Sequence, residues 1–294
     1  MAQPPLRASS LAAALLFLLP SAALAQSFPT VRDVSSFRSA GMGDATRGFA
    51  SSSEAILLNP AGIAANVRFN LDGQALFEPQ NDFRVLSATA TDSQLNAEET
   101  FALSAGFGYY HYTSGPTPET RRSGSIVALA LALPIYSDAI FIGFTGKYLS
   151  LEGVVNSSAI TTDAAVMYRP VNWFGISAIA YNIIDIRNPE ARRSFALGTA
   201  LGTDTEYHVD VDVKLEPNAA GTVSPTFHVG GEYLFAELIM PRVGFIEDRV
   251  RMARYVTGGA SLLLAPFAID AMYRYDLTGG THGFGVALRL TQIP

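Results

Sequence analysis

The chain contains no cysteine among its 294 residues. That absence excludes a disulfide framework, a thiolate metal site and a lipid-modified cysteine. Charged residues are also scarce, at 16% of the chain, and the formal net charge of −6 comes without a cluster of cationic residues. The chain therefore lacks the basic surface that nucleic-acid binding needs, and we expect no nucleic-acid partner.

Long apolar runs are missing too, once the first 25 residues are set aside. The chain is nonetheless 49% hydrophobic, with a mean hydropathy of +0.22, which is unusual for a soluble protein. After residue 25 no uncharged apolar stretch reaches the roughly 18 residues that a spanning helix requires. A closed β-barrel is the remaining way to pair every backbone group inside a bilayer. The composition therefore predicts a membrane β-barrel.

The first residues follow the order of a secretory signal peptide. Arg7 supplies the positive charge, an apolar run extends from Leu11 to Leu19, and Ala23-Leu24-Ala25 provides the small residues of a cleavage site. The apolar run is about half as long as a spanning helix. We therefore expect cleavage after Ala25 and export from the cytoplasm.

Beyond residue 68 the sequence divides into segments of about ten residues in which two kinds of side chain alternate. In residues 207–216 one face carries only tyrosine, valine and leucine, while the other carries His208, Asp210, Asp212 and further charged residues. Successive strand residues point to opposite sides, so such a segment places one face on lipid and the other in the lumen. Other segments alternate large apolar residues with alanine, glycine and serine, which leaves room in the lumen for a plug or a ligand.

The alternation predicts an all-β protein, a transmembrane antiparallel barrel of about fourteen strands. An even number is typical of bacterial single-chain barrels, and alternating short and longer connections predict that both termini lie in the periplasm. The predicted domains are a signal peptide over residues 1–25, an N-terminal hatch or plug segment over 26–67 and an outer-membrane β-barrel over 68–294. The predicted strands are 69–77, 82–91, 100–110, 123–134, 138–150, 158–169, 172–182, 193–202, 205–216, 225–235, 238–247, 253–264, 266–276 and 281–291.

Tyrosine and tryptophan lie mostly near the ends of these predicted strands. Amphipathic rings suit the headgroup level, so the pattern favours two aromatic girdles over the general preference of aromatic residues for strands. The last strand, with Gly285, Leu288 and Leu290, resembles the signal that the barrel-assembly machinery reads. Outer-membrane lipids and that machinery are therefore expected partners. The predicted girdle residues are Tyr109, Tyr148, Tyr168, Trp173, Tyr181, Tyr207, Tyr233 and Tyr255.

Residues 26–67 differ from the strands that follow. Gly41, Gly43 and Gly48 permit tight, non-helical backbone. Three serines followed by Glu54 predict one short helix, which Asn59-Pro60 would end.

The order of motifs in this segment identifies a resemblance. A Gly-x-Gly-Asp-Ala sequence, a run of small residues and then Asn-Pro-Ala-Gly just before the first strand resemble the plug of the FadL-like outer-membrane transporters of long-chain fatty acids and other hydrophobic compounds. The related PorV/PorQ-type barrels share this arrangement. The residues that carry the resemblance are Gly41, Gly43, Asn59, Pro60, Ala61 and Gly62.

The resemblance implies a fourteen-stranded barrel whose hatch fills the lumen. A hydrophobic small molecule or lipid would be held in the lumen and released sideways into the membrane at a kinked strand. Gly106 and Gly108 are the expected kink, because glycine weakens strand pairing; alternatively they only make room for the plug. The longest outer loop, expected at about 111–122, is too short for the external binding site of those transporters. The alternative function is a non-transporting, PorV-like barrel with a structural or secretion-associated role.

Several lumenal residues could carry other chemistry. His208, Asp210 and Asp212 share one face, and with His228 they could ligate a cation or simply line a polar lumen. His111 is expected in an outer loop, and no nucleophile motif accompanies any histidine. We therefore expect no enzyme, no catalytic residue, no metal site and no cofactor.

A second lumenal set lies on the last strands. Asp270, Arg274 and Arg289 are expected to pair with one another or with charged residues of the plug, because buried charges need partners. The alternative role for them is a charged constriction that selects small solutes.

Overall fold

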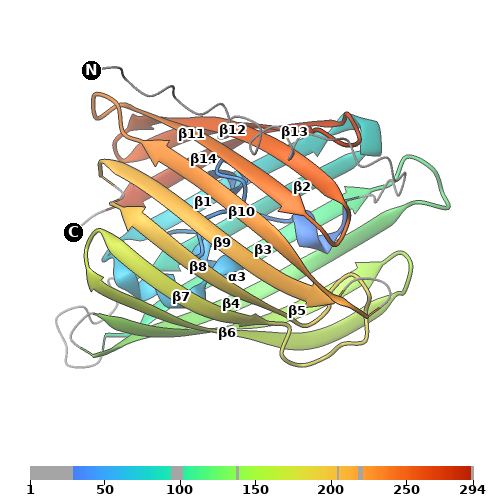
Figure 1. Ribbon diagram of the computed structural model, residues 1–294, viewed down its shortest axis with the longest axis horizontal. Coiled ribbons are helices and arrows are strands. Elements are labelled where there is room, and N and C mark those ends of the chain that lie inside the picture. Colours follow the sequence, from blue (N-terminus) through green and yellow to red (C-terminus); the bar gives the residue numbers. More distant parts are fainter. Residues whose placement is uncertain (1–28, 94–101, 137–138, 204, 218–220, 293–294) are drawn as a thin grey trace, which may run out of the picture.

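The computed structural model describes residues 29–93, 102–136, 139–203, 205–217 and 221–292. The predicted signal peptide lies outside the described residues. Fourteen antiparallel strands close into a barrel, in which each strand pairs with its neighbours in sequence and β14 returns to β1 (Figure 1). The predicted fold class and number of strands are confirmed. No helix among the described residues is long and apolar enough to cross a membrane.

The strands lie close to their predicted positions. Most observed ends fall within a few residues of the predicted ones, because the alternation continues to the turn residues on either side. The strands are β1 (Phe69–Glu78), β2 (Phe83–Asp92), β3 (Ser104–Ser114), β4 (Arg122–Tyr136), β5 (Ile140–Glu152), β6 (Ser157–Val171), β7 (Phe174–Tyr181), β8 (Ser194–Gly202), β9 (Tyr207–Pro217), β10 (Val223–Tyr233), β11 (Ile239–Asp248), β12 (Ala253–Leu264), β13 (Phe267–Asp276) and β14 (His282–Gln292).

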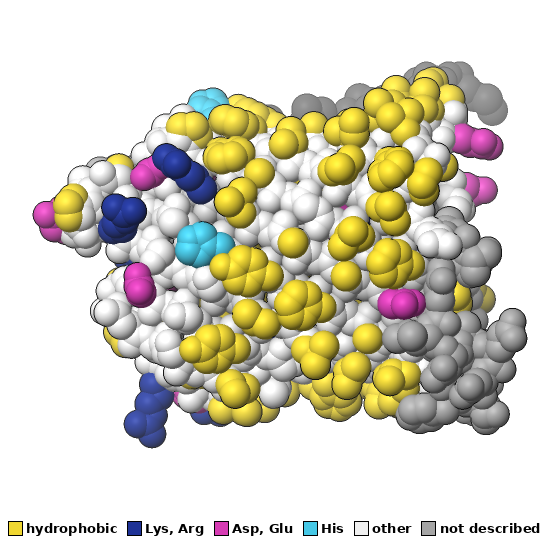
Figure 2. Space-filling view, turned by 180° about the vertical axis from the view of Figure 1, so that it is seen from behind, with side chains coloured by type: hydrophobic (Ala, Val, Ile, Leu, Met, Phe, Trp, Pro, Cys, Tyr) yellow, Lys and Arg dark blue, Asp and Glu magenta, His cyan; other side chains and the backbone are white. Residues whose placement is uncertain are grey.

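The two faces of each strand divide as the alternation predicts. In β9, Val209 and Val211 are exposed on the outside, whereas His208, Asp210 and Asp212 are buried inside. On the side of the barrel seen in Figure 2, hydrophobic side chains cover the middle and most charged ones lie toward the ends. An apolar surface of this extent would be unfavourable in water, so the outside of the barrel is suited to lipid.

Residues 29–67, called here the N-terminal segment, lie inside the barrel (Figure 1). They form the short helices η2 (Val31–Asp33), α2 (Phe37–Gly41), α3 (Ala55–Leu58) and η3 (Pro60–Ala65). A further turn, η4 (Pro79–Asn81), joins β1 to β2.

The predicted short helix is α3, which stands between Glu54 and Asn59 as expected. The prediction of non-helical backbone is wrong at Gly41, which ends α2. That helix forms because the Ser36 side chain accepts a hydrogen bond from the Ser39 amide and so caps its first turn.

The N-terminal segment crosses the lumen from one end to the other. We call the end where β1 begins the turn end and the opposite end the loop end. Ser114, at the loop end of β3, donates a 2.7 Å hydrogen bond to the Pro29 carbonyl, so the described chain begins at the loop end. η3 contacts β4, β5 and β6, and β1 then starts at the turn end. The barrel strands begin and end on one side, but residue 29 lies on the other because the segment traverses the lumen first. The prediction that puts both termini on one side therefore does not describe the start of the described chain.

An apolar core fills the part of the lumen beside β1 to β5. Phe37, Ile56 and Ile63 from the N-terminal segment belong to one buried cluster with wall residues such as Tyr110 and Leu149. The small inward residues of the strands therefore make room for this segment, one of the two occupants that the sequence predicted.

Two expectations about the loop end are wrong. His111 lies within β3, half-exposed, with Nδ1 3.0 Å from Ser125 Oγ, because the strand continues to Ser114. The connection after β3 is consequently limited to residues 115–121, and residues 182–193 between β7 and β8 form the longest connection at the loop end.

Candidate functional site

A chain of buried charges ties the N-terminal segment to the barrel wall. The Arg38 guanidinium lies 2.7 Å from a Glu54 carboxylate oxygen and 2.5 Å from one of Glu232. Its Nη2 is also 2.9 Å from His208 Nδ1. The Arg38 side chain is 7% exposed, so these contacts form away from water. His208 is therefore lumenal, as predicted, and contacts the segment.

The row of buried charges continues along the wall to Asp270 and Arg289, which belong to the second predicted lumenal set. Arg242 bridges Glu232, at 2.7 Å, and Asp270, at 2.9 Å, and Arg289 lies 3.6 Å from Asp270. Of the two kinds of partner expected for this set, Asp270 and Arg289 thus have each other. Arg242 was not predicted, although a cation at an inward position of β11 is a signal that the alternation contains.

A second group of contacts surrounds Arg47. Its backbone amide and its Nη1 donate to Asp212 Oδ2 at 3.0 and 3.1 Å. The neighbouring Gly48 amide donates to Asp210 Oδ1 at 3.1 Å. Both aspartates thus accept hydrogen bonds from the segment, and the polar-lining interpretation describes them better than the cation-site hypothesis. His228 lies apart and donates from Nδ1 to the Gly43 carbonyl at 2.8 Å. Within the described ranges no group of three or more His, Cys, Asp or Glu is arranged for a metal.

The loop end of the segment is anchored by Asp33. Arg251 contacts both of its carboxylate oxygens, at 2.7 and 2.8 Å, and Arg274 lies 3.8 Å away while contacting Glu78 at 2.9 Å. Burial raises the pKa of Asp33, but the charge and hydrogen bonds of Arg251, helped by Arg274, outweigh it and hold the pKa below its usual value. Arg274 thus faces Asp33 of the segment, a residue that the sequence analysis did not single out.

The Asn-Pro-Ala-Gly motif packs the segment upon itself and against β5. The Asn59 side-chain amide donates to the Arg47 carbonyl at 2.6 Å, and Pro60 begins η3. A Cβ on Gly62 would lie 1.8 Å from the Ala50 carbonyl oxygen, so only glycine fits there. Ala61 is fully buried and packs against Gly143 of β5.

The motif does not form the junction with β1 that its place in the sequence suggests. The last three residues of η3 and residues 66–68 separate it from β1, and at that junction the Arg68 amide donates to Ser93 Oγ at 2.8 Å.

Glycines on both surfaces let the segment touch the wall backbone to backbone. Gly43 has a φ of 66°, and a Cβ there would lie 2.8 Å from the Phe245 amide nitrogen. A Cβ on Gly198 of β8 would lie 2.5 Å from the Gly48 amide nitrogen. Gly41 contributes its carbonyl, which accepts a 3.0 Å hydrogen bond from Thr257.

Gly106 and Gly108 lie on the inner face of β3. β3 pairs with both β2 and β4 through them without a register shift, so the ladder gives no support to the predicted kink. A Cβ on Gly106 would meet Ile56 at 3.0 Å and Ile63 at 3.1 Å. At this position the alternative interpretation, room for the plug, agrees with the contacts.

A small cavity of about 110 Å³ remains between the segment, the wall and residues 182–193. Glu190 of that connection is held across the barrel mouth by Arg122 at 2.8 Å and Tyr112 at 3.4 Å. The lining combines apolar and charged side chains. The lining residues are Val31, Arg32, Val34, Arg47, Leu57, Leu58, Ile126, Lys147, Leu149, Tyr181, Asn182, Pro189, Glu190, Ala191, Arg192, Ser194, Lys214 and Glu216.

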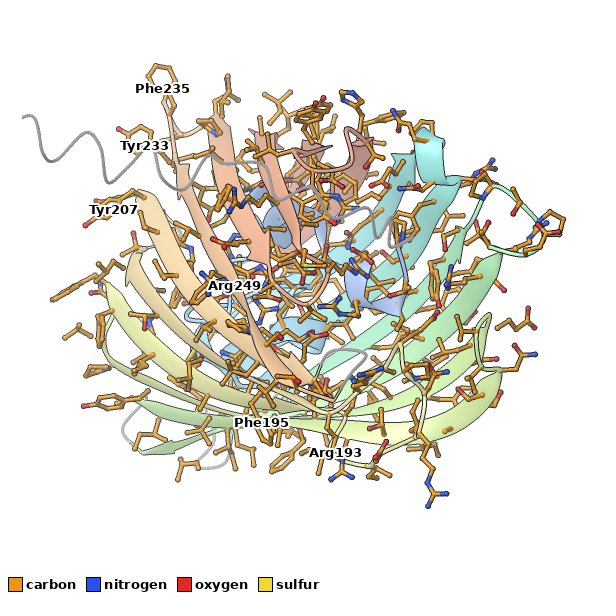
Figure 3. All side chains as sticks on the ribbon, turned by 45° about the vertical axis from the view of Figure 1, so that its right-hand side comes forward. Arg193, Phe195, Tyr207, Tyr233, Phe235 and Arg249 are labelled. Carbon is orange, nitrogen blue, oxygen red and sulfur yellow. The ribbon has the colours of Figure 1, made fainter. Side chains whose placement is uncertain are left out.

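A larger groove of about 480 Å³ lies on the outside of the barrel, across β5 to β9. Its lining is entirely apolar. Outward alanines of β6 and β7 form a low floor between larger side chains, among them Phe195, which points away from the barrel in Figure 3. The lining residues are Ile142, Phe144, Ala164, Ala165, Val166, Ala178, Ile179, Ala180, Phe195, Ala196, Leu197, Val213 and Leu215.

The aromatic residues follow the predicted girdle with two exceptions, Tyr181 and Tyr255. Tyr255 lies on the inner face of β12 with Thr257, and the buried Arg274 guanidinium lies 5.4 Å from the centroid of its ring. Tyr207, Tyr233 and Phe235 point outward at the turn end (Figure 3), and Trp173 is exposed at the same end. Tyr181, however, points into the lumen, where its hydroxyl donates to the Leu58 carbonyl. The girdle prediction is wrong for Tyr181 because its even-numbered neighbours, not it, face outward on β7.

Comparison with known proteins identifies the fold. No protein-family model matches this sequence, and no curated protein sequence matches it significantly. Among solved structures, the CymD monoaromatic hydrocarbon channel aligns with a TM-score of 0.61 and 11% identity over 87% of this chain and 98% of that one.

Two further structures agree. A FadL homologue of Pseudomonas aeruginosa gives a TM-score of 0.58 at 11% identity, covering 87% of this chain and 98% of its own. The toluene transporter TodX of Pseudomonas putida gives 0.54 at 11% identity, covering 86% and 96%. At this identity the similarity concerns the fold, and the chain has the fold of the FadL-type outer-membrane barrels, as the resemblance predicted.

Proposed function

We propose that this chain is an outer-membrane protein that passes hydrophobic small molecules, fatty-acid-like or aromatic, across the outer membrane. The observation that carries the proposal is a buried N-terminal segment inside a barrel of the FadL type. In this proposal the N-terminal segment is a hatch that closes the lumen of the barrel. The names of the similar structures, a toluene transporter and a monoaromatic hydrocarbon channel, point to the same class of cargo.

The physical chemistry of the cargo favours such a compartment. A hydrophobic molecule gains little from a water-filled pore, whereas apolar side chains inside a closed lumen give it a favourable environment. Leu57, Leu58 and Leu149 supply such side chains in the inner cavity. A lateral exit would let the molecule pass directly from there into hydrocarbon, and the apolar outside of the barrel supports that route.

The second candidate is a non-transporting barrel with a structural or secretion-associated role. The density of buried ion pairs favours it, because Arg38 and Arg47 hold the N-terminal segment firmly in place. The short connections at the loop end also leave little surface to capture cargo from outside. Measured transport decides between the two candidates.

Uptake by cells tests the proposed function. A Gram-negative host that lacks its own transporter of this kind should accumulate radiolabelled toluene or oleate faster with this chain than with an empty vector. Leu57→Trp, which fills part of the inner cavity, should reduce that uptake. Leu86→Trp is the matched control, because Leu86 is exposed on the outside of β2.

A correctly assembled barrel that brings in neither compound above the empty-vector level would refute transport of these compounds and favour the non-transporting role. Equal uptake by the two tryptophan variants would show that the inner cavity is not on the route.

A further inference from the structure

The barrel wall has its weakest backbone pairing at the loop end of β7. β7 has eight residues, whereas β6 beside it has 15. Their shared ladder begins only at Ala164 and Ala180 and shifts register near the turn end. Residues 157–163 of β6 therefore pair with β5 on one side and with no strand on the other.

A few hydrogen bonds close the wall where the ladder stops. One of them joins two backbone groups: the Ile183 amide donates to the Thr162 carbonyl at 2.8 Å. The remaining bonds use side chains: the Asn182 amide donates to Asp163 Oδ1, and Thr161 Oγ1 donates to the Ile184 carbonyl, both at 2.8 Å. We call residues 161–163 and 182–184 the seam.

One lysine reinforces the seam from the lumen. Lys147 Nζ lies 2.8 Å from both the Asn182 side-chain oxygen and the Asp163 carboxylate. Asn182 also donates to the Arg192 carbonyl at 3.0 Å, and its φ of 51° turns the chain away from the strand. Side chains can rearrange without separating two paired strands, so the seam is the stretch of wall that opens with the least loss of backbone pairing.

The two hollows lie back to back across this stretch of wall. Tyr181 and Ser194 line the inner cavity, and their neighbours Ala180 and Phe195 line the outer groove. Adjacent strand residues point to opposite faces, so one sheet thickness separates the cavity from the groove. Asn182 itself lines the cavity, and Ala164, where the ladder with β7 begins, lines the groove.

The cavity volume restricts what can pass. Apolar cavities of about 150 Å³ hold one benzene molecule. The inner cavity is smaller, at about 110 Å³, and its lining is partly charged, so it admits a compact molecule only as the seam yields. The groove outside is several times larger and fully apolar, so a molecule leaving the seam meets lipid-facing surface at once.

We propose that the seam between β6 and the end of β7 is a lateral exit for compact apolar molecules of about one aromatic ring. The molecule leaves the inner cavity past Asn182 and enters the outer groove over Ala164 and Ala180. The inference rests on the proposed transport function and places the exit away from Gly106 and Gly108, where β3 is fully paired.

A disulfide crosslink across the edge of the seam provides the test. The chain has no cysteine of its own, so two introduced cysteines can pair only with each other. Ala164→Cys combined with Ala180→Cys joins two register partners on the outer face. Directly opposed residues in an antiparallel pair have Cα atoms about 4.5–5.5 Å apart, within the range of a disulfide. Oxidation should hold the end of β7 against β6 and reduce toluene uptake to the empty-vector level, and reduction with dithiothreitol should restore it.

The matched control crosslinks the wall at the alternative exit. Ala88→Cys with Tyr109→Cys joins β2 to β3 on the outer face beside Gly108, and its oxidation should leave uptake unchanged. Block by this crosslink and not by the first would place the exit at β3 and overturn the inference. Uptake that survives both crosslinks would also overturn it and leave transport itself intact. Absent uptake by the reduced, folded variants would instead refute the proposed function, and the inference with it.

A second variant keeps the inference testable if a crosslink prevents folding. Asn182→Gly removes the side-chain bonds to Lys147 and to the Arg192 carbonyl, while glycine retains the left-handed backbone. The seam should open more readily and uptake should rise. Unchanged or lower uptake by this variant would overturn the inference.

Discussion

Many buried charges in the lumen lie next to an opposite one. Glu54, Arg38, Glu232, Arg242 and Asp270 form an alternating chain from the N-terminal segment to the wall. An ion pair out of water gains little net stability, but the loss of one partner leaves a charge without compensation. This row of ion pairs therefore specifies the position of the N-terminal segment more than it stabilises the barrel.

Arg38 is the residue whose loss should show this most clearly. Arg38→Met leaves Glu54 without its cation and Glu232 with one arginine instead of two, and should destabilise the folded protein by about 3–5 kcal/mol. Arg84→Met is the control: Arg84 pairs with Asp82 at the surface with its side chain 63% exposed, and its loss should cost about 0–1 kcal/mol. Urea unfolding of both variants in lipid vesicles measures the difference. Equal costs would mean that Arg38 is not buried against the wall.

The inward position of most lumenal residues could be predicted from the sequence, but most of their partners could not. Alternation alone places His208, Asp210 and Asp212 inside, because a strand leaves only two choices of face. The partner of Asp212 is Arg47, which lies 165 positions away in a segment without regular alternation. Its location depends on how that segment packs, and no local pattern encodes it.

Elements of the N-terminal segment illustrate the same limit. The sequence predicted one helix, α3, and missed η2, α2 and η3. Isolated helices this short are unstable in water, since nucleation costs more than a few hydrogen bonds return. They persist here because caps such as Ser36 and close contact with wall glycines such as Gly198 complete their environment. That environment exists only once the barrel surrounds them.

Removing the segment should leave an open barrel. Deletion of residues 30–62 removes the helices and their ion pairs, while the fourteen strands still close because the ladder from β1 to β14 involves none of these residues. Single-channel conductance in planar bilayers should therefore rise. Deletion of residues 117–120, in an exposed connection at the loop end, is the control and should change it little. Conductance unaffected by the first deletion would refute the role of the segment as a hatch.

At the scale of the whole molecule, the bilayer explains why the fourteen strands were predictable. Each strand must show lipid one face and the lumen the other, so the same period of two repeats in every strand. Connections carry no such constraint, and the errors lie there: His111 belongs to β3, and the longest connection at the loop end is residues 182–193.

Depth in the bilayer gives the last prediction. Val211 lies in the middle of β9, 52% exposed on the outer face, whereas Val223 lies at the loop end of β10, 62% exposed. Val211→Arg should cost about 2–4 kcal/mol because it places a charge near the bilayer midplane, and Val223→Arg about 0–1 kcal/mol because its charge reaches the headgroups. The two substitutions are chemically identical and start from similar exposure, so depth is the variable that distinguishes them. Urea titration of both variants refolded into vesicles gives the two costs. Similar costs would mean that the apolar outside of the barrel does not lie in a bilayer as the alternation and the exposed side chains indicate.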